Sequence, residues 1–91
     1  MPDRRYPWTS VLITGASSGI GRALAEACAA PGVTLHLSGR DPVRLDAAAS
    51  ACRAAGATVE ARIVDVRDAE GMAAWIGGAG RLELVIANAG V

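Results

Sequence analysis

The sequence predicts an α/β fold, a doubly wound parallel sheet truncated to about four strands in the spatial order 3-2-1-4, with three helices. Four short apolar runs alternate with three stretches that have helical character. Each connection is long enough for successive strands to lie parallel, and right-handed crossovers then fix the winding. The first apolar run leads into its helix through a glycine-rich turn, which is typical of such sheets.

The first strand is expected at residues 11–13, a short apolar run that fits a buried parallel strand. A helix is predicted over residues 19–30, because Ile20, Leu24 and Cys28 recur at four-residue spacing along one face. That apolar face would pack against the sheet.

The second strand is expected at residues 33–38. Asp41 is a good N-cap for the next helix, and Pro42 fits its first position, where a missing N–H costs nothing. This helix is predicted to run to about Ala55, with Gly56 as the C-cap residue. Its expected apolar stripe consists of Leu45, Ala49 and Cys52.

The third strand is expected at residues 58–64, and Asp68 is expected to cap a short helix after it. The apolar residues of that helix are Met72, Trp75 and Ile76. The glycine-rich residues 77–80 are predicted to break it, and the fourth strand follows at residues 82–87. Residues 1–8 are expected to form a flexible arm.

The composition excludes several classes of protein. Nine arginines balance nine acidic residues, so the net charge is zero, and no run of one charge supports binding to nucleic acid or to a membrane surface. No secretory signal and no stretch of about 18 apolar residues is present, so a membrane span is not expected. Cys28 and Cys52 fall in alanine-rich helical stretches, where free cysteine behaves as a small hydrophobe. They could form a disulfide in principle, but without a secretory signal a cytoplasmic location with reduced thiols is expected.

The strongest motif is TGASSGIG at residues 14–21, which lies directly after a strand and opens a helix. Glycine permits the tight turn and lets the backbone approach a pyrophosphate closely. Free N–H groups and the positive end of the helix dipole would then face this anion. The alternative, a plain strand–helix turn, is disfavoured because the required strand and helix are both predicted.

This TGxxxGxG spacing resembles that of the short-chain dehydrogenase/reductase family. Asp65-Val66 follows the third strand, where that family places an Asp that contacts the adenine ring. The run ANAG at residues 87–90 follows the fourth strand, where the family has an NNAG-like motif, and SGR at residues 38–40 forms the corner that selects the cofactor. Ala87 replaces the first Asn of NNAG, so the role of that Asn is not carried over. The resemblance implies that residues 1–91 form a partial NAD(P)-binding Rossmann domain.

The turn chemistry and the resemblance together imply one set of cofactor contacts and no metal-binding residue. The turn would hold the pyrophosphate, Asp65 and Val66 the adenine ring, and Asn88 the adenosine side of the pocket. Asp65 and Asn88 have an alternative role as plain residues at strand ends. The expected cofactor-binding residues are Gly15, Ser17, Ser18, Gly19, Ile20, Gly21, Arg40, Asp65, Val66, Asn88, Ala89 and Gly90.

The corner after the second strand predicts NADP(H), with NAD(H) as the alternative. An acidic residue about 20 positions after the glycines would bind the ribose 2′-hydroxyl of NAD, whereas arginine pairs with the 2′-phosphate of NADP. Gly39 leaves room at this corner and Arg40 supplies the charge. Ser17 or Ser18 would add a hydrogen bond. Asp41 also lies near the expected distance, but helix capping explains it.

No catalytic residue can be assigned. The resembled family transfers hydride with a Ser, a Tyr and a Lys, the last two as YxxxK, because a phenol of pKa about 10 needs a positive neighbour. The chain has no lysine, and its single tyrosine, Tyr6, precedes the first strand. His36 is expected to pack within its strand, and Arg22 is expected to pair with Glu26 one turn along the helix.

The sequence therefore predicts the N-terminal NADP(H)-binding fragment of a short-chain dehydrogenase/reductase oxidoreductase. In the full-length family, such a protein transfers hydride between NADP(H) and a carbonyl or alcohol substrate. The alternatives are a non-catalytic nucleotide-binding module and an inactive truncated remnant. The isolated chain is expected to be inactive, since the Tyr and Lys are missing.

Self-association is expected through the outer edge of the fourth strand, which would lack its next neighbour. One face of the sheet would carry a single helix, so apolar side chains would be partly uncovered. The candidates are Val11, Ile13, Leu35, Leu37, Leu84 and Ile86. In the alternative, Met72, Trp75 and the N-terminal arm fold over the gap.

Overall fold

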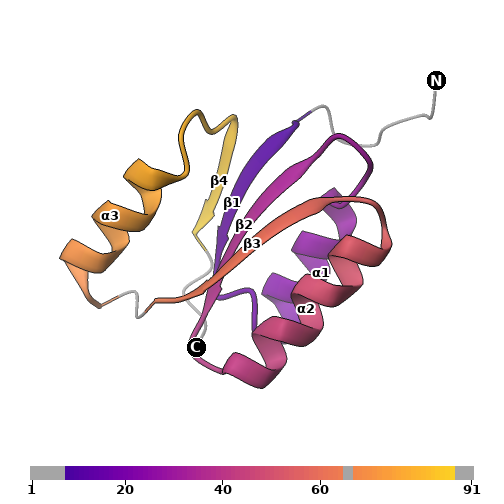
Figure 1. Cartoon of the computed structure of the whole chain (residues 1–91). Helices are drawn as coiled ribbons and strands as arrows, with labels where there is room; N and C mark the ends of the chain where they lie inside the picture. The colour runs from indigo at the N-terminus through magenta and orange to yellow at the C-terminus, as the bar shows by residue number, and fades with distance from the viewer. Residues whose placement is uncertain (1–7, 65–66, 88–91) are drawn as a thin grey trace.

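A computed structural model describes residues 8–64 and 67–87 and shows one parallel sheet flanked by helices (Figure 1). The strands are β1 (Ser10–Thr14), β2 (Thr34–Gly39), β3 (Thr58–Ile63) and β4 (Leu84–Ala87), and the helices are α1 (Gly19–Cys28), α2 (Pro42–Ala54) and α3 (Ala69–Gly78). The spatial order is β3-β2-β1-β4, and every neighbouring pair is parallel. The predicted fold class and strand order are confirmed.

The sheet has a core on each face. Helices α1 and α2 cover one face and α3 lies on the other (Figure 1). Val11 and Ile13 of β1 join the core that α1 and α2 complete, whereas Leu12 packs with Val64 and Trp75 of the α3 side. All three β1 residues are fully buried, so this strand is covered on both faces, as expected at the centre of a doubly wound sheet.

The predicted set of uncovered apolar side chains is wrong for β1 and β2. The members from these strands are fully buried, because they point to the face that two helices cover. These members are Val11, Ile13, Leu35 and Leu37. Leu84 and Ile86 pack against the same core and are half-buried. The exposed side chain of β4 is instead Val85 (51%), which pairs in register with Leu12 and so lies on the α3 face.

Side-chain caps fix the starts of α2 and α3. Asp41 accepts hydrogen bonds from the N–H groups of Val43 and Arg44 at 3.0 and 3.2 Å. Asp68 accepts one from the N–H of Gly71 at 3.1 Å. These donors have no acceptor within their own helix, so each cap satisfies a group that folding would otherwise leave unpaired. Both predicted N-caps are confirmed.

The glycine-rich residues 77–80 end α3, as the sequence predicts. Gly77 and Gly78 are both helical, and the chain turns only at Gly80, which has a φ of 76°. Glycine inside a helix costs about 1 kcal/mol, which burial of the Trp75 side chain outweighs. The other boundaries shift by one or two residues: α1 ends at Cys28, and β4 begins at Leu84.

The apolar face predicted for α1 is wrong at its first position. Ile20 is 71% exposed, whereas Gly21 and Ala25 are buried and Leu24 and Cys28 pack half-buried against the core. The helix therefore approaches the sheet mainly through small residues, and Ile20 stays in solvent. Among the described segments, no helix has the length and hydropathy that a membrane span requires.

Candidate functional site

The turn between β1 and α1 is tied to the end of β2. Gly15 has a φ of 67°, a left-handed conformation that glycine adopts without strain. The N–H of the next residue, Ala16, donates to the carbonyl oxygen of Ser38 at 2.7 Å. The turn therefore lies at the carboxyl ends of the two central strands, which is where ligands bind in open α/β sheets.

Ser18 is the N-cap of α1. Its hydroxyl donates to the carbonyl oxygen of Gly15 at 2.8 Å and accepts from the N–H of Gly21 at 3.1 Å. The hydroxyl hydrogen is thus directed into the turn. The sequence predicts a phosphate contact at Ser17 or Ser18, and the structure gives Ser18 a capping role, which leaves the Ser17 hydroxyl as the better candidate.

The two glycines at the start of α1 have different surroundings. A Cβ added to Gly21 would lie 2.1 Å from the carbonyl oxygen of Gly15 and 2.9 Å from the Cα of Ala16. The helix packs on the turn only because position 21 has no side chain. A Cβ added to Gly19 would meet no described atom within 4 Å. The space beside Gly19 is therefore open to a ligand.

Two backbone donors lie at the start of α1. Within the described residues, the N–H groups of Gly19 and Ile20 have no hydrogen-bond acceptor. They belong to the first turn of α1, where the helix dipole is positive, and such a position favours an anion in general. The exposed Ile20 side chain adds an apolar surface next to it.

The corner after β2 fits closely against the same turn. A Cβ added to Gly39 would lie 2.6 Å from the Oγ of Ser17, 2.8 Å from its Cβ and 3.2 Å from its backbone nitrogen. The room that the sequence predicts at Gly39 is thus taken up by Ser17. The turn and the corner form one continuous surface at the edge of the sheet.

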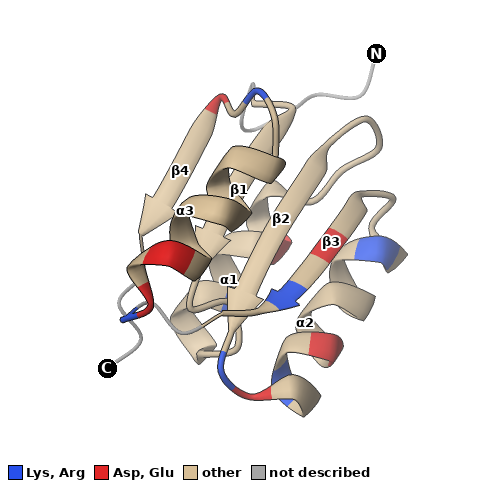
Figure 2. Cartoon of the chain, turned by 60° about the vertical axis from the view of Figure 1, so that its left-hand side comes forward, with Lys and Arg blue, Asp and Glu red and all other residues tan. Residues whose placement is uncertain are grey.

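The charged residues of this corner differ in how they are used. Figure 2 shows a basic and an acidic residue side by side where β2 leads into α2. The Asp41 carboxylate caps α2 and lies 3.5 Å from the guanidinium of Arg44. Arg40 is exposed, and no ion pair or hydrogen bond to it is formed by the residues described. Arg40 is therefore an exposed cation at this edge that no described residue engages.

Comparison with known proteins identifies the family. The family model described as short chain dehydrogenase matches residues 9–91. The chain belongs to this family. An uncharacterized oxidoreductase from Myxococcus xanthus is 44% identical over 88 residues, which cover 92% of this chain and 35% of that protein.

Solved structures of short-chain dehydrogenases share the fold. The enzyme from Serratia marcescens superimposes with a TM-score of 0.81 at 28% identity, covering 88% of this chain and 35% of that one. A metagenomic short-chain oxidoreductase in complex with NADP has a TM-score of 0.74 at 30% identity, covering 85% of this chain and 37% of that one. This short-chain dehydrogenase sequence thus spans about a third of the length of the relatives it matches.

Five of the predicted contacts of this short-chain dehydrogenase lie outside the described residues. They are Asp65, Val66, Asn88, Ala89 and Gly90. The described parts of β3 and β4 end at Ile63 and Ala87, at the same edge of the sheet as the glycine-rich turn. The five assignments remain predictions.

Two other polar residues have structural roles, and of their partners the sequence predicts only Glu26, the partner of Arg22. Arg22 lies 3.5 Å from Glu26, one helical turn away. His36 is buried within β2, and its Nδ1 lies 3.1 Å from the carboxylate of Glu60 on β3. Neither residue adjoins the space beside Gly19, and neither has a catalytic partner in the described chain.

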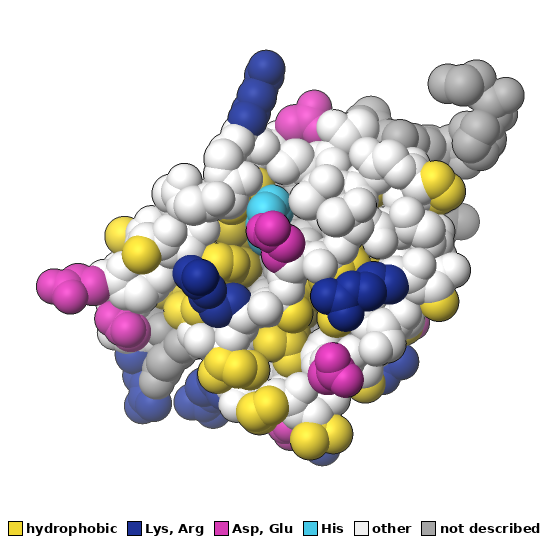
Figure 3. Space-filling model, viewed as in Figure 1, with side chains coloured by type: hydrophobic (Ala, Val, Ile, Leu, Met, Phe, Trp, Pro, Cys, Tyr) yellow, Lys and Arg dark blue, Asp and Glu magenta, His cyan; other side chains and the backbone are white. Residues whose placement is uncertain are grey.

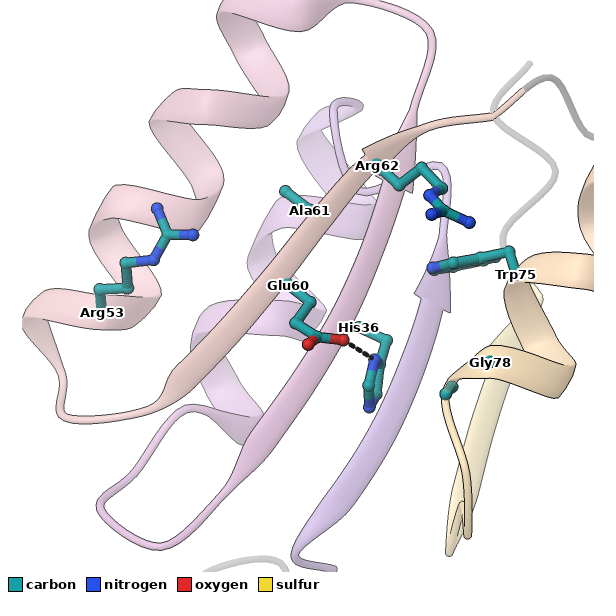
Figure 4. Close-up of a pocket in the computed structure, with 8 residues that line it drawn as sticks. His36, Arg53, Glu60, Ala61, Arg62, Trp75 and Gly78 are labelled. Carbon is teal, nitrogen blue, oxygen red and sulfur yellow. Dashed lines mark ion pairs between the residues drawn. The ribbon is translucent and has the colours of Figure 1, made fainter.

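A pocket of about 430 Å³ lies between β3 and α3. His36 and Glu60 form one side of it, and Arg62 extends toward Trp75 across its opening (Figure 4). Figure 3 shows the histidine and its acidic partner on the surface with basic side chains on either side. None of the residues that line the pocket belongs to the glycine-rich turn. The described residues also include no cluster suited to a metal ion.

The two cysteines behave as apolar core residues. Cys52 is fully buried and Cys28 packs half-buried against the same core. Burial raises the pKa of the Cys52 thiol to about 11, with a further rise from the nearby Glu26 carboxylate. Burial also raises the pKa of Cys28. Both thiols stay protonated at neutral pH and are poor nucleophiles.

Proposed function

We propose that the chain binds a nicotinamide dinucleotide along the carboxyl edge of the sheet and prefers NADP(H) to NAD(H). The match to the short-chain dehydrogenase family and the likeness to a relative in complex with NADP support dinucleotide binding. The preference for the phosphorylated cofactor is supported by the corner after β2.

The glycine-rich turn fits a pyrophosphate. The N–H groups of Gly19 and Ile20 lie at the positive end of α1, and the position beside Gly19 has room for a group that packs against the backbone. The Ser17 side chain borders the same surface. In this proposal, these donors hold the bridging phosphates, and Ile20 covers an apolar part of the cofactor.

The observation that carries the preference is the contrast between Arg40 and Asp41. Asp41 has one carboxylate oxygen, Oδ1, engaged in capping α2 and the other, Oδ2, 3.5 Å from the guanidinium of Arg44, so its charge already has partners within the chain. Arg40 is exposed at the end of β2 with no ion-pair partner in the described chain. A guanidinium there pairs with a 2′-phosphate through two parallel hydrogen bonds.

For the whole protein, we propose hydride transfer between NADP(H) and a carbonyl or alcohol substrate. The bound dinucleotide would supply or accept the hydride. The residues of this chain would bind its pyrophosphate and its adenosine phosphate. The absence of lysine from the sequence means that a proton donor of the Tyr-Lys type would have to come from outside these residues.

The test is calorimetric titration of the chain with NADPH and with NADH. We expect tighter binding of NADPH, and Arg40→Asp should abolish or reverse the preference. Loss of one charge-assisted contact costs about 1.5–3 kcal/mol, which is roughly a tenfold to hundredfold change in Kd.

Arg81→Asp is the matched control, because Arg81 precedes β4 at the opposite end of the sheet. It changes the net charge equally and should leave the ratio of the two Kd values unchanged. Equal affinity of the unaltered chain for both cofactors would contradict the proposed preference.

A further inference from the structure

The contact between Ser17 and Gly39 joins the glycine-rich turn to the corner that adjoins Arg40. We propose that these two residues form a sterically matched pair, in which the Ser17 side chain and not the backbone of β2 requires glycine at position 39. The inference rests on the proposed binding of NADP(H) to this edge.

The backbone at Gly39 does not itself require glycine. The glycines with positive φ in the described chain are Gly15, Gly32, Gly56 and Gly80, and Gly39 is not among them. It lies at the end of β2 in extended conformation, which any residue adopts. What excludes a side chain at position 39 is the space occupied by a neighbour.

That neighbour is Ser17. The Cβ of a residue at position 39 would lie 2.6 Å from the Ser17 Oγ and 2.8 Å from the Ser17 Cβ. The hydroxyl could rotate away, but the Cβ follows the backbone, so the second contact is relieved only if the turn moves. Removal of the Ser17 side chain would relieve both contacts and leave the 3.2 Å approach to its nitrogen.

The turn is held in place on both sides of Ser17. Ala16 donates to the Ser38 carbonyl oxygen, and Ser18 caps α1 with its hydroxyl. To make room for a Cβ at position 39, the turn would therefore have to move against the hydrogen bonds of Ala16 and Ser18. Displacing the turn also displaces Gly19, which belongs to the proposed phosphate site.

The pair has a consequence for specificity. A site for NAD uses an acidic residue about 20 positions after the glycines, and position 39 falls within that range. As long as Ser17 is present, an acidic side chain at position 39 collides with the turn that binds the pyrophosphate. A change of preference toward NAD thus needs substitutions at both positions.

The experiment is a double-mutant cycle of Gly39→Ala and Ser17→Gly. Two quantities are measured: the urea midpoint of unfolding without nucleotide, and the Kd for NADPH. We expect Gly39→Ala alone to lower the midpoint and to weaken NADPH binding about tenfold. In the Ser17→Gly background, the same substitution should change the Kd by less than about threefold and leave the midpoint nearly unchanged.

Gly77→Ala is the control for replacing a glycine by alanine, because a Cβ there meets no described atom within 4 Å. The pairing is overturned if Gly39→Ala changes the urea midpoint and the Kd equally with and without the Ser17 side chain. It is also overturned if Gly39→Ala changes neither quantity when Ser17 is present. If Gly39→Ala fails to fold, folding of the double variant supports the pairing, and failure of both overturns it.

The unfolding measurements separate this inference from the proposed function. If the unaltered chain does not prefer NADPH, the proposed function fails, while the midpoints still decide whether Ser17 and Gly39 are coupled. If NADPH is preferred but the two substitutions have additive effects on the midpoint and on the free energy of NADPH binding, the pairing alone fails.

Discussion

Three glycines around the turn are required for three different physical reasons. Gly15 supplies a left-handed backbone, Gly21 allows α1 to approach the turn, and Gly19 leaves space for a ligand. The sequence motif predicts all three as cofactor-binding residues. The structure separates Gly19 from Gly21, because an added Cβ would have open space at Gly19 and would collide with backbone atoms at Gly21.

Substitution of these glycines should separate folding from binding. Gly19→Ala should keep the urea midpoint of the chain, since alanine favours the helix, but should weaken binding of both cofactors at least about tenfold by filling the phosphate site. Gly21→Ala should destabilise the chain by about 1–3 kcal/mol, because its Cβ meets backbone atoms that cannot rotate away.

Urea unfolding and calorimetric titration of the two variants provide the measurement. The assignment of Gly19 to the phosphate site would be wrong if Gly19→Ala bound NADPH as tightly as the unaltered chain. Equal stability of the two variants would contradict the packing role of Gly21.

The sequence predicts residue roles well where the cause is local. Asp41 and Asp68 cap the helices that follow them, and Arg22 pairs with Glu26 along one helix face. The contact of Ser17 with Gly39 could not be predicted, because it joins positions on two elements whose spacing depends on the packed sheet. The capping role of Ser18 had a signal, since a serine directly before a helix is a favoured N-cap.

Among the elements, β1 and β4 are joined by a side-chain clamp in addition to their backbone pairing. The Glu83 carboxylate, just before β4, accepts hydrogen bonds from the N–H and hydroxyl of Thr9 at 2.6 and 2.5 Å and from the N–H of Ser10 at 3.1 Å. These bonds, the Thr9 hydroxyl first, lower the pKa of Glu83. The clamp fixes the amino ends of two strands that are far apart in the sequence.

The clamp should make stability depend on pH in the acid range. The folded-state pKa of Glu83 lies below its unfolded value. The contribution of the clamp to the free energy of unfolding is therefore complete above the ordinary glutamate pKa, and it is lost as pH falls through the folded-state pKa. Glu83→Gln should therefore lower the urea midpoint at about pH 7. It should also reduce the difference between the urea midpoints measured at about pH 7 and at about pH 3.

Glu70→Gln on α3 is the control for this substitution, since it removes a carboxylate from another element. If the urea midpoints of Glu83→Gln at the two pH values differed as much as those of the unaltered chain, the clamp would not contribute to the pH dependence of stability.

The order of strands follows from the sequence, but the direction of side chains does not. The alternation of apolar runs with helical stretches predicts the sheet, because each connection is long enough for parallel pairing. In a strand that is apolar on both sides, nothing in the sequence says which residues point to which face. This is why Val11 and Ile13 were expected to be uncovered, whereas the structure leaves Val85 exposed.

The whole molecule has a sheet with unequal edges. β3 carries charged residues, including Glu60 and Arg62, along its exposed edge, and such charges discourage pairing with another chain. β4 has the apolar sequence LVIA and pairs only with β1 in the described chain. With Val85 exposed as well, the β4 edge is the one suited to association.

We expect the isolated chain to self-associate through β4 or to form a loosely packed state that binds an apolar dye. Val85→Lys should lower the average mass measured by light scattering at high concentration. The control is Val43→Lys, at an exposed position on α2, which should leave the mass unchanged. A strict monomer with a sharp thermal transition and no dye binding would contradict this prediction.

We also expect no turnover of carbonyl or alcohol substrates by the isolated chain. The sequence has no lysine, and its one tyrosine, Tyr6, precedes β1. NADPH absorbance should stay constant with purified protein, because removal of catalytic groups that act as a unit leaves little activity. Steady consumption that scales with protein concentration and disappears in Gly19→Ala would refute this expectation.

The central position of β1 has a consequence for how the chain is made. One neighbour of β1, strand β2, follows it closely, but the other, β4, is synthesised roughly 70 residues later. At a synthesis rate of about 5–20 residues per second, several seconds pass between the synthesis of Leu12 and that of Val85, its partner in β4. During that interval the strand that ends as the most enclosed part of the molecule is an open edge. We therefore expect the nascent chain to need protection by a chaperone most strongly just before residues 84–87 emerge.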